Sequence, residues 1–392
     1  DKNILAVLAA VIIIIFFIPY TASGFAACGK LFSSLFGMNY MTAMIISAVV
    51  IVAYTTAGGF FAASATDFVQ SIIMTVAIVF VLVFSTISAG GVDAVVENAK
   101  ALPGYLSLTA SYIEDTGKSE PYNLLHIITT LSWGLGYFGM PHILLRFMAI
   151  EDEKKLRLSR RVASVWVVIA MAMAVLIGIV GRALSNTGLV DQLHGNDTET
   201  IIVRVAHLLS TYGAFPAIMA GLILAGILAS TMSTADSQLL AAASSVSENI
   251  LREAFHLKIS EKKSMLAARL TVIGIAILGI IIARNPDSSV FGIVSFAWAG
   301  FGAAFGPLVI CSLFWKRTTL PGAIAGMASG GAMVFIWKYL IKPIGGVFGI
   351  YELLPAFLVG LVLMVIVSLC TKAPSKEITD EFDRVKAMGK AK

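Results

Sequence analysis

The sequence predicts an all-α integral membrane protein with ten membrane-spanning helices, because of its composition and the length of its apolar segments. Of the 392 residues, 58% are hydrophobic and only 13% are charged, whereas about a quarter of the residues in a soluble domain are charged. A chain this apolar has too few polar side chains to cover a surface in water. Most of its apolar segments reach the roughly 17 residues that a helix needs to cross a bilayer. The sequence shows no alternating apolar and polar pattern, so a membrane β-barrel is disfavoured.

The predicted spans follow one another along the whole chain. Their long runs of Ala, Ile, Val and Leu fit helices, which satisfy their own backbone hydrogen bonds in lipid. Gly58 and Gly59 mark a turn between the second and the third span. The ten spans are residues 4–27, 38–57, 67–90, 122–142, 162–181, 214–247, 267–283, 288–314, 319–341 and 351–370.

The loops and the two ends of the chain predict its orientation. Twenty of the 28 Lys and Arg residues lie at the termini or in loops on the same side of the ten spans. Because positively charged loops stay in the cytoplasm, both termini should be cytoplasmic. The net charge of +5 then reflects this topology, and no nucleic-acid partner is needed to explain it. The long outward loops, residues 91–121 and 183–213, could carry short surface helices that form a lid or a solvated connector, and the charged tail should be a short helix or disordered.

The fourth predicted span contains a stretch that disfavours a helix, SWGLGYFGMPH from Ser132 to His142. Each of its three glycines costs about 1 kcal/mol in a helix interior, and Pro141 about 3 kcal/mol. Broken membrane helices are tolerated where the unwound backbone is buried or lines a cavity, and in many transporters they bind substrate and ions. Trp133, Tyr137 and Phe138 add aromatic surface that suits a small ligand with an apolar ring or chain. The alternative is a kinked helix whose glycines pack against another helix.

A stripe of oxygen-bearing side chains runs along the sixth predicted span. Ser230, Ser233, Thr234 and Ser237 follow a spacing that places their hydroxyls on one helix face, and Asp236 lies among them. Polar groups inside a membrane span are costly and usually line a pathway. Hydroxyl, carbonyl and carboxylate oxygens suit a hard cation. The alternative is that the hydroxyls bond back to their own helix.

Other polar and glycine-rich positions have two interpretations each. Asp67, together with Thr66, could cap the third span or serve as an acidic step on an ion exit path. Arg146 could reach the membrane interface or form a cytoplasmic gate contact. The stretch AWAGFGAAFGP at 297–307 is best explained by close helix packing.

No motif for enzyme chemistry stands out in the sequence. We find no nucleophile–base motif, phosphate loop or cluster of metal ligands, and the five histidines are scattered. Cys28, Cys311 and Cys370 are isolated and are interpreted as small packing residues. The sequence therefore predicts a membrane protein that is not an enzyme.

Taken together, four segments of the chain resemble the sodium:solute symporter family. They are SWGLGYFGMPHILLRFMA, ILASTMSTADSQLL, TDFVQ and SFAWAGFGAAFGPLV. The resemblance implies thirteen membrane helices, ten of them in two inverted five-helix repeats. The chain begins at what looks like the fourth helix, so we expect the first three, including the family's other broken helix, to precede it. It then divides into the rest of the first repeat (1–90), an external loop (91–121), the second repeat (122–314), two peripheral helices (315–371) and a cytoplasmic tail (372–392).

The resemblance also implies sodium as the coupling ion and assigns its ligands. Ser233 and Thr234 match the two residues whose hydroxyls bind the main sodium ion, and Ser230 matches a residue that offers its backbone carbonyl. The remaining ligands of that site belong to the helix expected upstream, so we expect no transport by residues 1–392 alone.

A second sodium site, seen in some relatives, is implied by a different set of residues. Asp67 matches an aspartate linked to sodium binding and release, and it would act with Ser233, Asp236 and Ser237. Asp236 stands where those relatives have serine.

The implied activity is sodium-coupled import of a small zwitterion by alternating access, in a bacterial plasma membrane. Trp133, Tyr137 and Pro141 match the substrate side of the broken helix, and Tyr20 matches a tyrosine near the substrate. Met140 stands where glutamine is expected, which could change the choice among proline, proline betaine and related solutes. Proline is favoured, with another amino or carboxylic acid as the alternative. A symporter-like membrane sensor and a channel or structural membrane protein also remain open.

Overall fold

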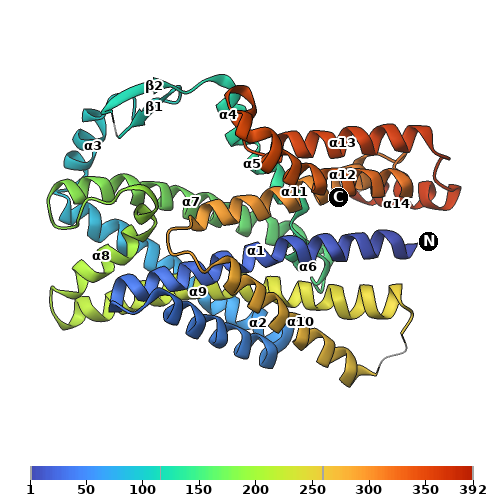
Figure 1. Cartoon of the computed structure of the whole chain (residues 1–392), viewed down its shortest axis with the longest axis horizontal. Coiled ribbons are helices and arrows are strands. Elements are labelled where there is room, and N and C mark those ends of the chain that lie inside the picture. Colours follow the sequence, from blue (N-terminus) through green and yellow to red (C-terminus); the bar gives the residue numbers. More distant parts are fainter. Residues whose placement is uncertain (1, 115, 258–259, 391–392) are drawn as a thin grey trace.

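The computed structural model describes residues 2–114, 116–257 and 260–390, without the side chains of residues 2–3, 59–62, 253–254 and 388–390. It is nearly all helical, as the sequence predicts (Figure 1). The principal helices are α1 (Lys2–Phe36), α2 (Tyr40–Ser88), α3 (Val92–Ala101), α4 (Leu124–Leu131), α5 (Trp133–Gly136), α6 (Pro141–Met148), α7 (Leu156–Asn186), α8 (Ile201–Ser210), α9 (Ala214–Ser244), α10 (Glu261–Ile282), α11 (Val290–Phe314), α12 (Leu320–Ile336), α13 (Leu353–Cys370) and α14 (Lys376–Lys390).

Within the described residues, nine segments are long and apolar enough to cross a membrane. They correspond to nine of the ten predicted spans. The remaining predicted span, residues 122–142, is divided among α4, α5 and α6 and has no continuous helix of that length. The spans run roughly parallel to the long axis of the molecule (Figure 1). We call the end where α1 begins and α13 ends the basic end, and the opposite end the loop end.

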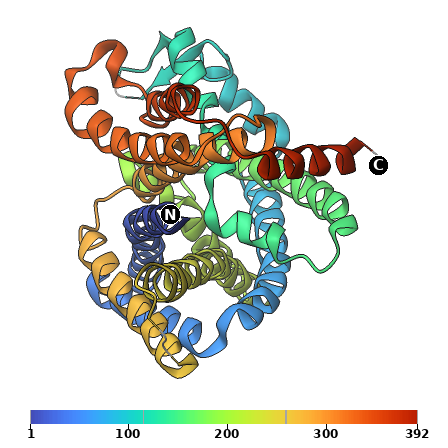
Figure 2. The same cartoon turned by 90° about the vertical axis from the view of Figure 1, so that its right-hand side faces the viewer.

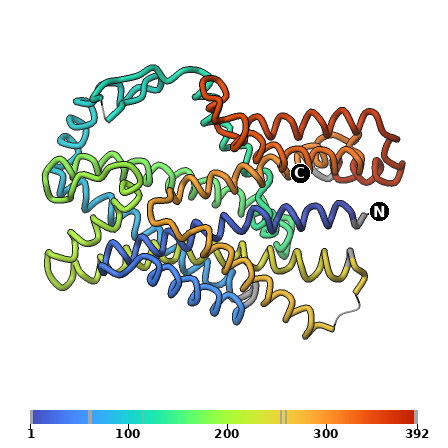
Figure 3. The backbone as a smooth tube through the Cα atoms, in the orientation of Figure 1, coloured from blue at the N-terminus to red at the C-terminus, as the bar shows by residue number. Residues whose placement is uncertain are grey.

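The sequence predicts two helices separated by a turn in this region, but the structure has one helix, α2. It is helical from Tyr40 to Ser88 without interruption, yet it contains two spanning segments, Tyr40–Gly58 and Ala63–Ser88. Figure 3 shows that both ends of α2 lie at the loop end, so the helix bends and its halves form a V. The turn predicted at Gly58 and Gly59 does not separate two helices, because both residues belong to the helical backbone of α2. The helical backbone continues because glycine in a helix is unfavourable by only about 1 kcal/mol.

The loop end is less purely helical than predicted. Residues 91–121 contain α3, as expected, but also a hairpin of β1 (Ala110–Ile113) and β2 (Lys118–Pro121). Gly117 has a φ of +64°, a conformation that glycine adopts without steric cost, and its N–H donates to the Ile113 carbonyl across the turn. Residues 183–213 contain α8 and a short 3₁₀ segment, Gly195–Thr200.

Close packing of small residues holds the second half of the bundle together. A Cβ atom built on Gly330 of α12 would lie 2.1 Å from the Ala303 carbonyl oxygen of α11. A Cβ atom on Gly326 would lie 2.9 Å from the Gly360 carbonyl oxygen of α13. In a membrane, such small residues let helix backbones approach and gain van der Waals contact. Seen from the basic end, α12 and α13 lie on one side of the bundle, and α14 projects outward beside them (Figure 2).

Candidate functional site

The predicted break in the fourth span is present. Helix α4 ends at Leu131, α5 ends at Gly136, and a 3₁₀ turn covers Tyr137–Gly139. Met140 then has extended backbone angles, φ −80° and ψ 107°, and α6 starts at Pro141. Proline suits the first position of a helix because its missing N–H would have no partner there.

The glycines of the break also pack against another helix, as the alternative interpretation of this stretch predicts. A Cβ atom on Gly136 would lie 1.9 Å from the Trp298 Nε1 atom of α11. A Cβ atom on Gly139 would lie 2.2 Å from the Phe301 carbonyl oxygen, and one on Gly302 would lie 2.7 Å from the Gly136 Cα atom. The glycine-rich stretch 297–307 is therefore a packing surface, as predicted, and its partner is the broken helix.

Trp133 belongs to a stack of aromatic rings at the break. Its ring centroid lies 5.5 Å from Phe291, 5.2 Å from Trp298 and 5.8 Å from Tyr351, with interplanar angles of 20° or less. The Trp298 Nε1–H also donates to the Trp133 carbonyl oxygen over 3.0 Å. This freed carbonyl is thus satisfied by an indole. Trp133 also lines a cavity of about 450 Å³ toward the loop end, together with Glu199.

The other predicted substrate residues lie around the break in different environments. Tyr137 is 43% exposed, and its ring meets the ring of Trp298 edge-on at 4.8 Å. Tyr20 on α1 lies close to α6, with its ring centroid 5.9 Å from that of His142. Met140 is fully buried, so its side chain faces protein.

The hydroxyl stripe on α9 forms as predicted, and the hydroxyls of Ser233, Thr234 and Ser237 bond back to their own helix. Ser233 Oγ and Thr234 Oγ1 both donate to the Ser230 carbonyl oxygen, over 3.3 Å and 3.0 Å. Ser237 Oγ donates to the Ser233 carbonyl oxygen over 3.0 Å. A hydroxyl that donates its proton backward keeps its lone pairs as acceptors. The donor set therefore fits a hard cation such as sodium while each hydroxyl keeps its helix bond.

Asp236 lies inside the protein with hydroxyl partners. It is fully buried, and its carboxylate accepts a hydrogen bond from the Tyr54 hydroxyl of α2. Its Oδ1 also lies 3.3 Å from Ser237 Oγ and shares that hydroxyl's one proton with the Ser233 carbonyl oxygen. Tyr54 was not among the predicted site residues. The sequence offers one indication of its role, because Tyr54 places a polar hydroxyl within an apolar span. A buried tyrosine hydroxyl usually has a hydrogen-bond partner.

Arg146 joins Asp67 to the stripe. Its Nη2 donates to Asp67 Oδ2 over 2.5 Å and to Ser237 Oγ over 2.7 Å, which connects α6, α2 and α9. Asp67 does not cap a helix, because α2 continues through it. The structure thus brings Asp67, Asp236 and Ser237 together, and it adds Arg146 as a cation within the same cluster.

Two neighbouring cavities lie between the aromatic break and the stripe. The cavity beside Trp133 shares Ile202 and Ile227 with a smaller one of about 220 Å³, and Ser230 lines the smaller one. At the basic end, a third cavity of about 520 Å³ lies between His142 and Ser237. Together, the three cavities place open space on both sides of the broken helix and beside α9.

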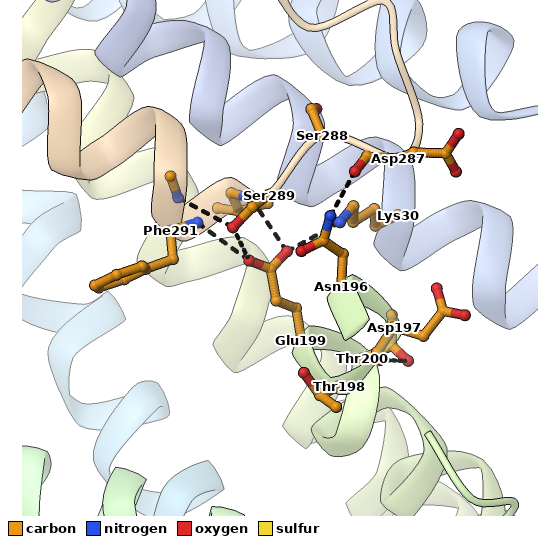
Figure 4. A network of polar contacts seen from close by, with 12 residues as sticks. Lys30, Asn196, Asp197, Thr198, Glu199, Thr200, Asp287, Ser288, Ser289 and Phe291 are labelled. Carbon is orange, nitrogen blue, oxygen red and sulfur yellow. Dashed lines mark hydrogen bonds and ion pairs between the residues drawn. The ribbon is translucent and has the colours of Figure 1, made fainter. Parts of the chain in front are cut away.

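A polar network at the loop end was missed by the sequence analysis (Figure 4). Glu199 accepts hydrogen bonds from Lys30 Nζ of α1 over 2.9 Å, from Ser289 Oγ, and from the N–H groups of Val290 and Phe291, which begin α11. Burial raises the pKa of Glu199, but these four hydrogen bonds outweigh it, so its pKa lies below the ordinary value of 4.5. Nothing in the spacing of the sequence connects residues so far apart.

Comparisons with known proteins agree on one family. The model of the sodium:solute symporter family matches residues 1–330. The chain is 38% identical to sodium/proline symporter 2 of Staphylococcus saprophyticus, over 99% of this chain and 74% of that protein. It is also 38% identical to the osmoregulated proline transporter OpuE of Bacillus subtilis, over 96% of this chain and 73% of that protein.

A solved structure shares the fold. A Na⁺-coupled sialic acid symporter in a substrate-bound, outward-open state matches with a TM-score of 0.73 at 18% identity. The match covers 94% of this chain and 75% of that one. At this identity the likeness supports the architecture alone. The family model and the similar curated proteins, each covering nearly the whole chain or most of it, show that this chain belongs to the sodium:solute symporter family.

Proposed function

We propose that the protein imports L-proline together with sodium by alternating access. The observation that carries this proposal is the placement of an aromatic, glycine-rich helix break near a stripe of cation-compatible oxygens on α9. Half-helices of this kind bind substrate and coupling ions in other secondary transporters. The relatives named sodium/proline symporter and proline transporter OpuE support proline as the substrate.

The residues divide into two roles in this proposal. Ser233 and Thr234 offer hydroxyl oxygens to sodium, and Ser230 offers its carbonyl oxygen. Trp133, Tyr137, Pro141 and Tyr20 surround the substrate at the break. Asp67, Ser233, Asp236 and Ser237 form a second place for a cation, next to the guanidinium of Arg146.

Orientation follows from the charges. Since twenty of the 28 Lys and Arg residues belong in the sequence to the termini or to loops on one side of the ten predicted spans, we place the basic end in the cytoplasm of a bacterial plasma membrane. Sodium then enters down its electrochemical gradient, and the membrane potential contributes about 2.3 kcal/mol per charge per 100 mV. With one sodium ion per turnover, this energy alone would concentrate proline roughly fifty-fold.

The test is uptake of labelled proline into proteoliposomes, with the protein expressed from its complete reading frame. Wild-type protein should show saturable uptake that requires an inward sodium gradient. Ser233→Ala and Thr234→Ala should each raise the sodium concentration for half-maximal uptake about tenfold or more, as expected when a ligand to the ion is removed.

Thr271→Ala is the matched control. Thr271 on α10 makes the same backward hydrogen bond, from its Oγ1 to the Ala267 carbonyl oxygen, outside the stripe. Its loss should leave the sodium dependence unchanged. Sodium-driven uptake of another solute without proline would keep the mechanism and replace the substrate, and no uptake of any small solute would reject the transporter proposal.

A further inference from the structure

The cavity at the basic end has polar walls of opposite charge. It measures about 520 Å³ and lies where α6 and α9 meet the π-helical segment Ser245–Ala254. Arg146 and His142 stand on the α6 side, and Glu248 stands on the side of the π-helical segment. Ser237 and Ser244 of α9 also line it.

The α6 wall has unused hydrogen-bonding capacity. His142 and Arg146 are four residues apart, so their side chains share one helix face. The His142 Nδ1 atom is buried without a hydrogen-bond partner among the described residues. Arg146 uses only Nη2 in its bonds to Asp67 and Ser237, so within the described chain its Nη1 and Nε donors remain free. A guanidinium binds a carboxylate through two parallel hydrogen bonds either from Nη1 and Nη2 or from Nε and Nη2. A carboxylate bound in this way needs Nη2, the nitrogen that bonds to Asp67 and Ser237.

The opposite wall offers an acceptor for a positive charge. The Glu248 carboxylate accepts hydrogen bonds from Arg252 over 2.9 Å and from Ser264 over 3.1 Å, and its side chain remains 44% exposed. Each carboxylate oxygen can accept more than one hydrogen bond. A guanidinium on one wall and a carboxylate on the other complement a small molecule that carries both charges.

We propose that this cavity is a second, inner binding site for a small zwitterionic carboxylate, at which the ligand's carboxylate replaces Asp67 as the partner of Arg146. The proposal rests on the proposed function in taking proline as the ligand. The ligand's ammonium group lies toward Glu248. Because Asp67 and the ligand compete for one guanidinium, occupation of the inner site releases the Asp67 carboxylate. Released Asp67 is then free to hold a cation that leaves the stripe through Ser237.

The experiment measures occupation of the cavity directly, independent of transport. Ser244→Cys places one thiol on the cavity wall, in a background in which the exposed Cys370 is changed to serine. Vesicles that expose the basic end are treated with a membrane-impermeant maleimide, and labelling is followed at increasing proline concentration. Proline should slow the labelling of S244C, and it should not affect the labelling of Ser312→Cys, which lies at the same end but outside this cavity.

Three further changes separate ligand binding from a structural role. Prolinamide lacks the carboxylate and should protect only at about tenfold or higher concentration, because a charge-assisted hydrogen bond is lost. Glu248→Gln in the S244C background should weaken protection by a similar factor, whereas Glu151→Gln, on an exposed ion pair with Lys155, should not. Asp67→Asn removes the competitor for Arg146 and should strengthen protection about tenfold.

The sign of the Asp67→Asn effect is decisive. If Asp67 only holds Arg146 in place, its replacement by asparagine leaves Arg146 disordered, and protection by proline weakens or stays the same. Either result overturns the proposal. Equal protection by proline and prolinamide overturns it as well. Sodium-driven proline uptake without protection of S244C would reject the inner site and leave the proposed function standing, whereas protection without uptake would do the reverse.

Discussion

Gly136 packs directly against α11, and its lack of a side chain makes that contact possible. The indole of Trp298 fills the place where a Cβ atom would lie. The same indole donates to the Trp133 carbonyl oxygen, three residues before Gly136. One glycine therefore permits both the packing of the break and the hydrogen bond that satisfies its backbone.

Gly136→Ala should destabilise the protein and impair transport. The added methyl group must displace Trp298, and overpacking of this kind costs about 1–3 kcal/mol. Gly134→Ala is the matched control, because a Cβ atom on Gly134 meets nothing within 4 Å. It should leave stability unchanged or raise it slightly, since alanine favours the helix by about 1 kcal/mol. Thermal melting in detergent and proline uptake would check both variants, and equal melting temperatures would contradict this account of the break.

The residue types at the site were predictable from the sequence, whereas several of their partners were not. The Ser230–Ser237 stripe follows from helical spacing alone, because all of its members lie on one helix. The bonds of Arg146 to Asp67 and of Tyr54 to Asp236 join residues that are 79 and 182 positions apart. Spacing carries no information at such separations.

At the scale of elements, the start of α11 is fixed by a residue from a distant loop. Glu199 accepts hydrogen bonds from the first N–H groups of α11, which lack partners inside the helix. Its negative charge also interacts favourably with the positive end of the helix dipole. Lys30 ties the same carboxylate to α1. The loop end thus holds three elements together at one side chain.

Stability should depend on pH through Glu199. Its pKa is lowered in the folded state, so the stabilisation is complete above the unfolded value of about 4.5 and is lost as the pH falls through the folded pKa. Glu199→Gln should cost about 1 kcal/mol at neutral pH, as for other caps. Melting curves from pH 7 to pH 3 should show the gap between wild type and E199Q closing below about pH 4.5. Glu97→Gln on exposed α3 should show no such gap, and a gap for E199Q that persists at pH 3 would refute this role.

The elements themselves were predictable to different degrees. Nine spans were predicted correctly because length and hydrophobicity determine whether a helix can cross a membrane. The break was predicted because glycine and proline act locally. The bend of α2 and the β1–β2 hairpin were not predicted, since they depend on packing and on a short polar segment with weak local preferences.

At the scale of the whole molecule, the positive charges are collected at one end, and this asymmetry sets the proposed orientation. The basic end contains the N-terminus, the loop after α9 and the tail helix α14. The tail is tied to the bundle by an ion pair of 2.8 Å between Lys316 and Asp383. The division of the chain into repeats and peripheral helices stays a prediction.

Cysteine labelling can check the orientation without any new thiol. Cys370 at the end of α13 is exposed, whereas Cys28 and Cys311 are buried. A membrane-impermeant maleimide should label Cys370 in inside-out vesicles and not in intact cells, and C370S should abolish the signal. Labelling in intact cells would reverse the assigned orientation.

The ring stack around Trp133 has an optical consequence. Two of the five tryptophans, Trp133 and Trp298, lie nearly parallel with ring centroids 5.2 Å apart, one on the broken helix and the other on α11. Indoles this close couple their electronic transitions, so their near-ultraviolet circular dichroism and fluorescence depend on the distance between them. Any movement of the broken helix relative to α11 therefore changes the circular dichroism and the fluorescence of the protein, and it can be followed without an added label.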